Sequence, residues 1–598
     1  MTANNDFSIH VATVNGSGSQ TANTTLLRAI FQMGIPVSGK NLFPSNIAGL
    51  PTWFTIRVCD QGYLARKRRN DVLVGMNPET SVEDVSAMSP GSILVLNDGV
   101  PLPKIPDDRT VYKIPFNKLV EPLVADVKLR KLVVNMVYVG VVAHLLGIDP
   151  EEVDRALSAQ LGKKPKALDM NRAAVRAGAD YAARNLKPAP FRLERRTKTE
   201  GKILIEGNQA AALGAMFGGV TFLSWYPITP SSSLAESLQG YLERFRRDPK
   251  TGKATFAVVQ AEDEIAAIGM VLGASWTGAR AMTTTSGPGL SLMTEFTGFS
   301  YFAEVPAVIW DIQRIGPSTG LPTRTSQADL LSVAFLSHGD TKHVILFPAT
   351  VEDCYLFGMK AFDLAERLQT PVFVLSDLDI GMNIWMSDPF RYPDKPWDRG
   401  KVLAAEDLAK VSTFERYRDL DHDGIPYRTL PGTDHPLAGY FTRGSGHDER
   451  AAYTENPEAY KRLMDRLAAK FETARSFVPP PVVERAPGAT TGILGFGSSH
   501  WAIVEARDVL AEDGLKTNYL LLKAYPFTKE VRSFIEACDR VYVVEQNRDG
   551  QMKSLLTMEY PDLAMKLRSI LHYDGLSIDA ESIVDQVKER EREGVLAR

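Results

Sequence analysis

The stretch FLSWYPITPSSS, at residues 222–233, is the part of the sequence that most clearly decides the fold. Its apolar first half is typical of a buried strand, and after a turn with two prolines the apolar spacing indicates a helix. Ser233 and Glu236 have the spacing of a capping box, which predicts that this helix begins there. Because α/β sheets place ligand-binding groups at the carboxyl ends of parallel strands, Thr229 is a candidate substrate contact. A merely well-capped helix would explain the same residues.

Apolar runs and helical patterns alternate along most of the 598-residue chain, which predicts an α/β fold with several parallel-sheet domains. We expect domains at residues 1–190, 201–385 and 489–598, with a charged, proline-interrupted linker at 185–200. Residues 386–488 are rich in Pro, Asp, Arg and Gly, and we expect them to form a long connecting segment over another domain or subunit. The strands expected in the second domain are 222–228, 254–260, 281–286, 307–313, 343–347 and 371–376.

Composition describes an ordinary globular protein. The chain has 68 basic and 72 acidic residues, so it lacks the basic excess typical of nucleic-acid binding. Cys59, Cys354 and Cys538 lie far apart, which argues against a disulfide framework and against a metal or iron–sulfur site on this chain. We expect neither a signal sequence nor a membrane span, because the most apolar segment, 132–148, contains polar residues that suit a buried helix. A cytoplasmic protein is therefore expected.

Three acidic residues follow the second expected strand of the 201–385 domain, in the sequence QAEDE at residues 260–264. One of Glu262, Asp263 and Glu264 should face a buried environment at the start of the next helix. A desolvated carboxyl group there could exchange a proton with a nitrogen heterocycle. Acids in the first turn also stabilise a helix through its dipole, so a purely structural role stays open.

A loop that could hold an anion follows the fourth expected strand, in the sequence RIGPSTGLPTR at residues 314–324. Its guanidinium groups can bind a carboxylate in bidentate fashion, although an ordinary loop is an equally good explanation of these residues alone. This loop, the Thr229 turn, the acids at 260–264 and Ser286 all lie at carboxyl ends of successive strands. They should therefore converge on one edge of the sheet, and together they are far more specific than any one of them.

In these motifs the sequence resembles the 2-oxoacid:ferredoxin oxidoreductases, in the branch with a gamma-type domain fused ahead of the alpha domain. The stretches YPITPSS, EDE, TSGPG and GPSTGLPTR follow in the order of that family, and EQNRDGQ at 545–551 is similar to its carboxyl-terminal domain. The resemblance implies that a 2-oxoacid and coenzyme A become an acyl-CoA and carbon dioxide, with thiamine diphosphate as cofactor and electrons passed to ferredoxin. It also implies that 1–190 is the gamma-type, coenzyme A-side domain, 201–385 binds the thiamine pyrimidine, and 489–598 is similar to the transketolase carboxyl-terminal domain.

The resemblance also implies roles for individual residues. The pyrimidine-side glutamate of the family maps onto Glu264, with Glu262 as the alternative, and would favour the imino tautomer that removes the thiazolium C2 proton. Thr229, Arg314 and Thr323 map onto positions that hold the substrate carboxylate. The remaining cofactor-side residues that the resemblance implies are Tyr226, Pro227, Ile228 and Ser286.

The gamma-type domain would close over the active site. Ser45 matches a serine that approaches the substrate, but AGLP at 48–51 replaces the Arg-Gly-Gly-His common after that serine. The sequence GSGSQ at 16–20 stands where relatives often have a Gly-x-Gly-Gly-Gln turn. The coenzyme A contacts implied by this turn are Gly16, Ser17, Gly18 and Gln20.

Motifs for the metal-bound diphosphate and for an iron–sulfur cluster are missing from the sequence, so no metal site is expected on this chain. The resemblance assigns Mg²⁺ and a [4Fe-4S] cluster to a beta subunit, in an (αβ)2 heterotetramer. Fused members often use 2-oxoglutarate in the TCA cycle, although pyruvate, branched-chain 2-oxoacids and the direction of the reaction stay open. Two other hypotheses are a non-redox thiamine-enzyme component, against which the loop at 314–324 and the gamma-type domain argue, and a non-catalytic nucleotide-binding protein.

Overall fold

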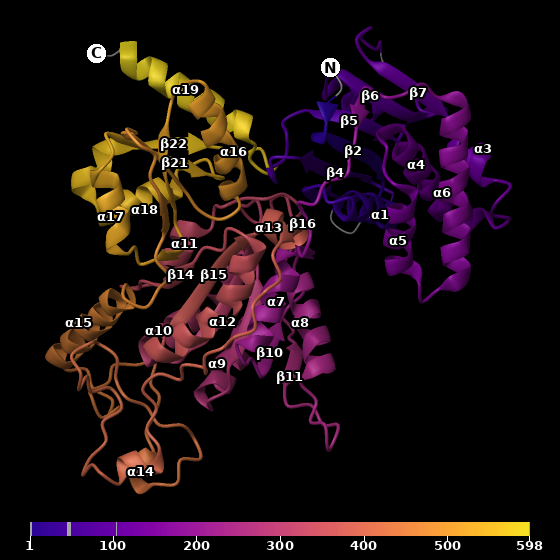
Figure 1. The fold of residues 1–598 in the computed structure, drawn as a ribbon. Helices are drawn as coiled ribbons and strands as arrows, with labels where there is room; N and C mark the ends of the chain where they lie inside the picture. The colour runs from indigo at the N-terminus through magenta and orange to yellow at the C-terminus, as the bar shows by residue number, and fades with distance from the viewer. Residues whose placement is uncertain (1–2, 45–48, 103, 597–598) are drawn as a thin grey trace.

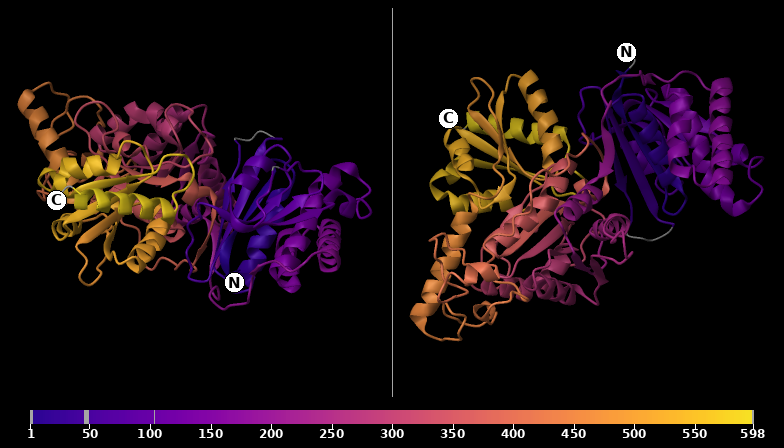
Figure 2. Two further views of the ribbon diagram at one scale, coloured as in Figure 1. Left: turned by 90° about the horizontal axis from the view of Figure 1, so that it is seen from above. Right: turned by 60° about the horizontal axis from the view of Figure 1, so that its bottom comes forward.

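The computed structural model describes residues 3–44, 49–102 and 104–596. These residues form three α/β domains, each built on a sheet covered by helices, and an extended connecting segment. The amino-terminal and carboxyl-terminal domains lie on either side of the molecule, and both contact the central domain (Figure 1 and Figure 2). The connecting segment runs along the outside of the central domain and carries α14 (Ala405–Leu408) and α15 (Pro457–Ala474). The fold is α/β, as the sequence predicts.

The amino-terminal domain is built on an eight-stranded sheet in the order β7-β6-β5-β2-β4-β3-β16-β9. β2, β5, β6 and β7 are parallel, but β4 is antiparallel to both β2 and β3. The expected parallel sheet is present in β2, β5, β6 and β7, and the short connection from β3 to β4 adds an antiparallel part to it. The strands are β2 (Asp6–Val14), β3 (Val37–Leu42), β4 (Pro51–Cys59), β5 (Asn70–Gly75), β6 (Met88–Asn97) and β7 (Thr110–Ile114).

Two strands of this sheet come from beyond residue 200. β9 (Ile203–Glu206) and β16 (Ile384–Ser387) pair with each other, and Ile384 pairs with Gly39 of β3. The amino-terminal sheet thus continues across both expected boundaries of the 201–385 domain. The expected linker also contacts the first domain, where β8 (Phe191–Arg192) pairs with β1 (Ala3–Asn4).

A group of helices covers the amino-terminal sheet. α4 (Val127–Leu146) is long and apolar enough to cross a membrane by length and composition, but 67% of its most apolar window is buried inside the protein. It packs closely on α6, since a side chain at Gly140 would collide with the backbone of Val175. It is thus a core helix. The main helices of this domain are α1 (Ser19–Gln32), α4, α5 (Pro150–Leu161) and α6 (Pro165–Asn185).

The central sheet has the order β11-β10-β12-β13-β15-β14-β20, and its first six strands are parallel. Helices α9 and α10 cover one face and helices α7, α8 and α12 cover the other. The strands are β10 (Phe222–Trp225), β11 (Ala257–Gln260), β12 (Ala281–Thr285), β13 (Ala307–Gln313), β14 (Val344–Leu346) and β15 (Pro371–Asp377). The helices are α7 (Gly207–Phe217), α8 (Ser232–Phe245), α9 (Glu264–Trp276), α10 (Gly287–Ala303) and α12 (Val351–Leu368).

The carboxyl-terminal domain joins the central domain through shared structure. Its strand β20 (Ala524–Tyr525) pairs antiparallel with β14. At a second contact, the Gln327 backbone amide donates to the carbonyl oxygen of Gln546 at 2.8 Å. Its own sheet has the strands β17 (Val482–Glu484), β19 (Thr517–Leu521), β18 (Thr491–Gly495), β21 (Arg540–Glu545) and β22 (Leu567–Leu571). Its helices are α16 (Ser499–Glu512), α17 (Lys529–Glu536), α18 (Gln551–Glu559) and α19 (Ala580–Leu596).

A buried charge cluster anchors the connecting segment. Glu304, at the end of α10, is fully buried and accepts hydrogen bonds from Arg466 and from Lys470 Nζ of α15, the latter at 2.8 Å. Burial alone would raise the pKa of Glu304, but the two cations hold it well below its usual range. The cluster fixes α15 against the central domain.

Candidate active site

The loops after β10 and β13 meet at the carboxyl edge of the central sheet. Arg314, which follows β13, donates a hydrogen bond from Nη1 to the carbonyl oxygen of Thr229 at 2.7 Å. Its side chain is buried, and within the described residues its Nε makes no hydrogen bond. Burial lowers the pKa of Arg314, whereas Asp329 and Glu264 oppose this shift. The site thus holds a buried guanidinium beside the Thr229 turn, with donor capacity left for an anion.

Hydrogen bonds from α7 stabilise the Thr229 turn. Asn208 of α7 donates to the carbonyl oxygen of Pro230 at 3.0 Å and to Ser233 Oγ at 2.7 Å. Helix α8 begins at Ser232, and its cap residue Ser231 makes no side-chain capping bond. The predicted capping box is therefore wrong, because Ser233 instead accepts from Asn208. No sequence pattern around Asn208 indicated this support.

The three acids after β11 occupy three different environments. Glu262 is exposed, and Asp263 caps α9 by accepting a hydrogen bond from the Ala266 amide at 2.7 Å. Glu264 is buried and lies against the first turn of α10, where a side chain on Gly289 would be 3.0 Å from Glu264 Oε1. Asp263 therefore has the helix-capping role that the sequence left open. Glu264 instead lies at the carboxyl edge of the central sheet, which we call the strand-end edge.

Ser286 is the cap residue of α10 and stands three residues before Gly289, which lies against Glu264. Ser286 is fully buried, and among the residues that the structure describes its Oγ has no hydrogen-bond partner. Tyr226, Pro227 and Ile228, by contrast, are partly exposed in the turn that leads to Thr229. The edge therefore combines one buried carboxyl group, one unpartnered hydroxyl group and an accessible turn.

The loop at 314–325 brings parts of all three domains together. Arg324 Nη1 donates to the carbonyl oxygen of Phe43 in the amino-terminal domain at 3.3 Å and to that of Thr323 at 3.0 Å. The Thr325 amide donates to the carbonyl oxygen of Gly575 in the carboxyl-terminal domain at 3.1 Å. Thr323 itself is buried. Ser45, which the sequence analysis places near the substrate, lies outside the described residues.

The glycine turn of the amino-terminal domain precedes α1. Gly16 and Gly18 have φ values of 83° and 80°, which favour glycine. Ser17 donates no side-chain hydrogen bond within the described part of the chain, and its carbonyl oxygen accepts from Asn135 at 2.6 Å, whereas Gln20 is exposed. The Gly49 amide donates to the carbonyl oxygen of residue 15 at 3.1 Å, so the turn lies beside the segment that follows the Ser45 region.

Comparison with known proteins identifies the family. Residues 213–389 match the family described as pyruvate flavodoxin/ferredoxin oxidoreductase, thiamine diP-bdg, and residues 8–181 match pyruvate ferredoxin/flavodoxin oxidoreductase. The alpha subunit of 2-oxoacid:ferredoxin oxidoreductase 1 from Aeropyrum pernix is 31% identical over 98% of each chain. The chain belongs to the 2-oxoacid:ferredoxin oxidoreductase family. The resemblance seen in the sequence is thereby confirmed, as are the α/β fold class and the assignment to an oxidoreductase subunit.

Two further relatives of this oxidoreductase subunit carry more specific names. The 2-oxoglutarate synthase subunit KorA of Methanothermobacter thermautotrophicus is 36% identical over 58% of this chain and 88% of that protein. The 2-oxoglutarate:ferredoxin oxidoreductase from Magnetococcus marinus, solved with 2-oxoglutarate, coenzyme A and succinyl-CoA bound, is similar in structure. Its TM-score is 0.87 at 31% identity, over 98% of this chain and 99% of that one. The similarity thus extends across all three domains.

The residues at the strand-end edge fit the pyrimidine side of thiamine diphosphate. Gly289 leaves the space that Glu264 and Thr285 occupy, since a side chain there would lie within 2.0 Å of Thr285 Oγ1. The buried Ser286 hydroxyl and the Glu264 carboxyl group are the kinds of group that bind ring nitrogens and their hydrogens. The donor set therefore suits a neutral aminopyrimidine.

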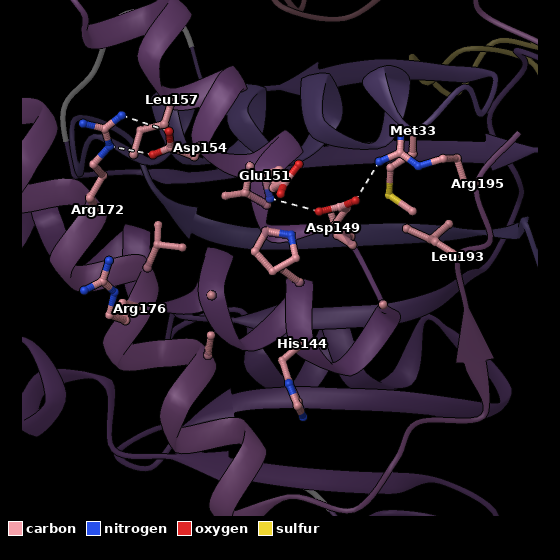
Figure 3. A pocket seen from close by; sticks show the side chains of 18 of the residues that line it. Met33, His144, Asp149, Glu151, Asp154, Leu157, Arg172, Arg176, Leu193 and Arg195 are labelled. Carbon is pink, nitrogen blue, oxygen red and sulfur yellow. Dashed lines mark hydrogen bonds and ion pairs between the residues drawn. The ribbon is translucent and has the colours of Figure 1, made fainter. Parts of the chain in front are cut away.

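A large cavity of the oxidoreductase subunit lies elsewhere, between α4, α5 and α6 (Figure 3). Its volume is about 1420 Å³. Arg172 forms an ion pair with Asp154, and Arg195 forms one with Asp149, and all four residues line the cavity. Among the described residues that line it, none is one of the candidate site residues. The candidate active site is therefore identified by the buried charged and polar groups at the strand-end edge, and not by the size of a cavity.

Proposed function

We propose that this chain is the alpha subunit of a 2-oxoglutarate:ferredoxin oxidoreductase. The enzyme would convert 2-oxoglutarate and coenzyme A to succinyl-CoA and carbon dioxide, reduce ferredoxin and run in either direction. The observation that carries the proposal is the buried Arg314–Thr229 contact beside the buried Glu264, on the one edge that all three domains approach. The names of the Magnetococcus and Methanothermobacter relatives support 2-oxoglutarate as the substrate.

Arg314 and Thr229 hold the carboxylate next to the reacting ketone. Arg314 already binds the Thr229 carbonyl oxygen through Nη1, which orients the rest of the guanidinium toward the edge. A guanidinium and a hydroxyl group grip one carboxylate from two directions, and this fixes the neighbouring ketone in place. Thr323, buried in the same loop, completes this group.

Glu264 and Ser286 form the proposed cofactor side, with Tyr226, Pro227 and Ile228 at its entrance. The Glu264 carboxyl group would share a hydrogen bond with the pyrimidine ring and exchange a proton with its ring nitrogen, which favours the imino tautomer. When bound, thiamine diphosphate supplies the nucleophilic carbon and the electron sink for decarboxylation. Glu262 is exposed, so Glu264 takes the role that the sequence analysis leaves open between them.

The remaining partners are assigned by chemistry. Cys59, Cys354 and Cys538 are each buried in a different domain, and among the described residues no group of His, Cys, Asp or Glu could hold a metal ion. We therefore assign the [4Fe-4S] cluster and Mg²⁺ to a beta subunit, in a cytoplasmic (αβ)2 complex. Coenzyme A is proposed to approach through the amino-terminal domain, at the Gly16–Gln20 turn and Ser45.

An exposed apolar helix face supports the docking of that beta subunit. Ile265, Met270 and Trp276 of α9 are 42%, 41% and 38% exposed, on the helix whose first residue is Glu264. Gly273 of the same helix has no atom within 4 Å of the position that a side chain would take, so a partner can approach closely there. Glu264 lies on the opposite, buried face of the same helix, so a partner here would cover the helix that positions Glu264.

The test is the reduction of a low-potential viologen dye by the chain co-purified with its beta partner. Reduction should require both coenzyme A and a 2-oxoacid, and 2-oxoglutarate should have the highest kcat/KM in a panel with pyruvate and branched-chain 2-oxoacids. Glu264→Gln should abolish turnover but retain assembly, while the matched variant Glu262→Gln should stay active. A complex inactive with every 2-oxoacid refutes the proposal, and preference for another acid refutes the substrate alone.

A further inference from the structure

A second pair of carboxyl groups lies next to Arg314 and has no part in the function proposed above. Asp311 stands three residues before Arg314 on β13 and is fully buried. Asp329 immediately precedes α11 (Leu330–Ala334), and its backbone amide donates to Gln313 Oε1 at 3.1 Å. Its two carboxyl oxygens lie 2.8 Å from the position that a Gly287 side chain would take. The glycine thus makes room for Asp329 at the first residue of α10.

The two carboxyl groups contact each other away from water. Within the described residues neither oxygen of Asp311 has a hydrogen-bond partner, nor has Oδ2 of Asp329, and the two carboxyl groups are close enough for each to shift the pKa of the other. A proton held between them would satisfy these buried oxygens. Thr285 and Leu375 are its neighbours across the sheet, so neither adjacent strand supplies a positive charge there. Two neighbouring carboxyl groups in such a buried site cannot both be ionised without a large cost in free energy.

Of the two carboxyl groups, Asp311 is the one that keeps its proton. Burial, together with the neighbouring Asp329, raises the pKa of Asp311 well above its ordinary value. Burial also raises the pKa of Asp329, but Asp311 and Arg314 oppose that shift. The amino terminus of α10, at Gly287, further favours a negative charge at Asp329. Asp311 therefore donates, and Asp329 accepts as a carboxylate.

The charge on this pair matters because Arg314 has to attract an anion. Asp329 and Glu264 both act on Arg314 electrostatically, and the adjacent strand β15 places the buried Asp377 opposite Gln313. A second ionised carboxyl group at Asp311 would add a negative charge where a 2-oxoacid must bind. The shared proton removes that charge.

We propose that Asp311 and Asp329 hold a single proton between them and act as positioning residues for Arg314, so that one carboxylate orients it and its positive charge remains available to the substrate. This inference rests on the proposed function of Arg314. Its consequence is a pH dependence in substrate binding. When rising pH removes the shared proton, the added negative charge repels the 2-oxoacid, so KM rises while kcat changes little. Both carboxyl groups then also lose their mutual hydrogen bond.

The experiment measures KM for 2-oxoglutarate against pH in the complete complex with the beta subunit. Wild-type KM should rise by roughly tenfold across its basic limb, the effect of one added charge at short range in a partly buried site. Asp311→Asn keeps a hydrogen-bond donor but cannot lose a proton, so its KM should be nearly independent of pH. The matched control is Asp377→Asn. Asp377 lies on β15, the strand next to β13, and its buried carboxyl group accepts a hydrogen bond from Ser498 of the carboxyl-terminal domain, so this variant should keep the wild-type rise.

Two results would overturn the proposal. One is a wild-type pH profile retained in Asp311→Asn, and the other is an Asp311→Asn KM raised more than about tenfold at neutral pH, a loss that would require an ionised Asp311. If the variant does not assemble, infrared spectra of the wild-type complex with isotope-labelled aspartate decide the question. They should contain the carbonyl band of a protonated carboxyl group at neutral pH that is lost in Asp329→Asn, and a missing band contradicts the pair. This measurement needs no turnover, so an inactive complex that shows the band refutes only the proposed function.

Discussion

Replacing Arg314 with Lys separates the charge of this side chain from its shape. The Arg314 guanidinium donates to the Thr229 carbonyl oxygen at 2.7 Å and has further N–H groups for a carboxylate. A lysine ammonium keeps the charge but cannot serve both partners in the same fixed geometry. The loss of one hydrogen bond to a charged group costs about 1.5–3 kcal/mol. We therefore expect kcat/KM for 2-oxoglutarate to fall by roughly tenfold to hundredfold, mainly through KM.

The assay is the initial rate of viologen reduction against 2-oxoglutarate concentration, at saturating coenzyme A. Arg399→Lys is a matched control, because Arg399 also donates to a backbone carbonyl oxygen, that of Gly278, at 2.7 Å, but at the opposite end of α9 from Glu264. Its kcat/KM should change by less than about threefold, within the range of surface substitutions. If Arg314→Lys and Arg399→Lys have equal kcat/KM values, Arg314 does not hold the carboxylate and the reasoning is wrong.

Two other perturbations test the support of the site. Glu304→Gln leaves Arg466 and Lys470 as buried cations without their carboxylate, which should lower the free energy of unfolding by about 3–5 kcal/mol. Because the folded protein lowers the pKa of Glu304, its stabilisation is present above a pH of about 4.3 and is lost as pH falls, so thermal unfolding of the wild-type complex should be more acid-sensitive than that of the variant. An unchanged unfolding midpoint would contradict this role. Met270→Asp should prevent co-purification with the beta subunit, whereas Met565→Asp, at a residue 82% exposed, should not; equal recovery would move the docking face elsewhere.

Local patterns predicted most elements of the fold, because strands and helices follow from nearby apolar spacing. The strand at 307–313 has the bounds expected from the sequence, and the strand expected at 371–376 ends one residue later, at Asp377. The pairing of β16 with β9 and β3 could not be predicted in this way. It joins residues near 384 to residues near 205 and 39, and such contacts depend on how domains pack, which no local pattern records.

In the candidate site, too, some features could be predicted from the sequence and others depend on packing between distant segments. The order of the strands made it possible to predict that the Thr229 and Arg314 loops share an edge, and they are in contact. Between the two glutamates, the resemblance to the family favoured Glu264, and the structure gives a physical reason: Glu264 shares a helix face with Ile268 and Val271, which are buried. The support from Asn208 and the proximity of Asp329 arise from segments distant in sequence, so only three-dimensional packing reveals them.

The strands β9 and β16 have a consequence for any attempt to divide this protein. Cutting the chain within residues 185–200 would not free the amino-terminal domain, because strands from beyond the cut complete its sheet next to β3. A separately expressed fragment of residues 1–190 would instead expose β3 as an unpaired edge, open to association with other strands. A two-polypeptide version of this subunit would thus have to reassemble by strand addition, and the strength of that edge would decide whether the two pieces stay together.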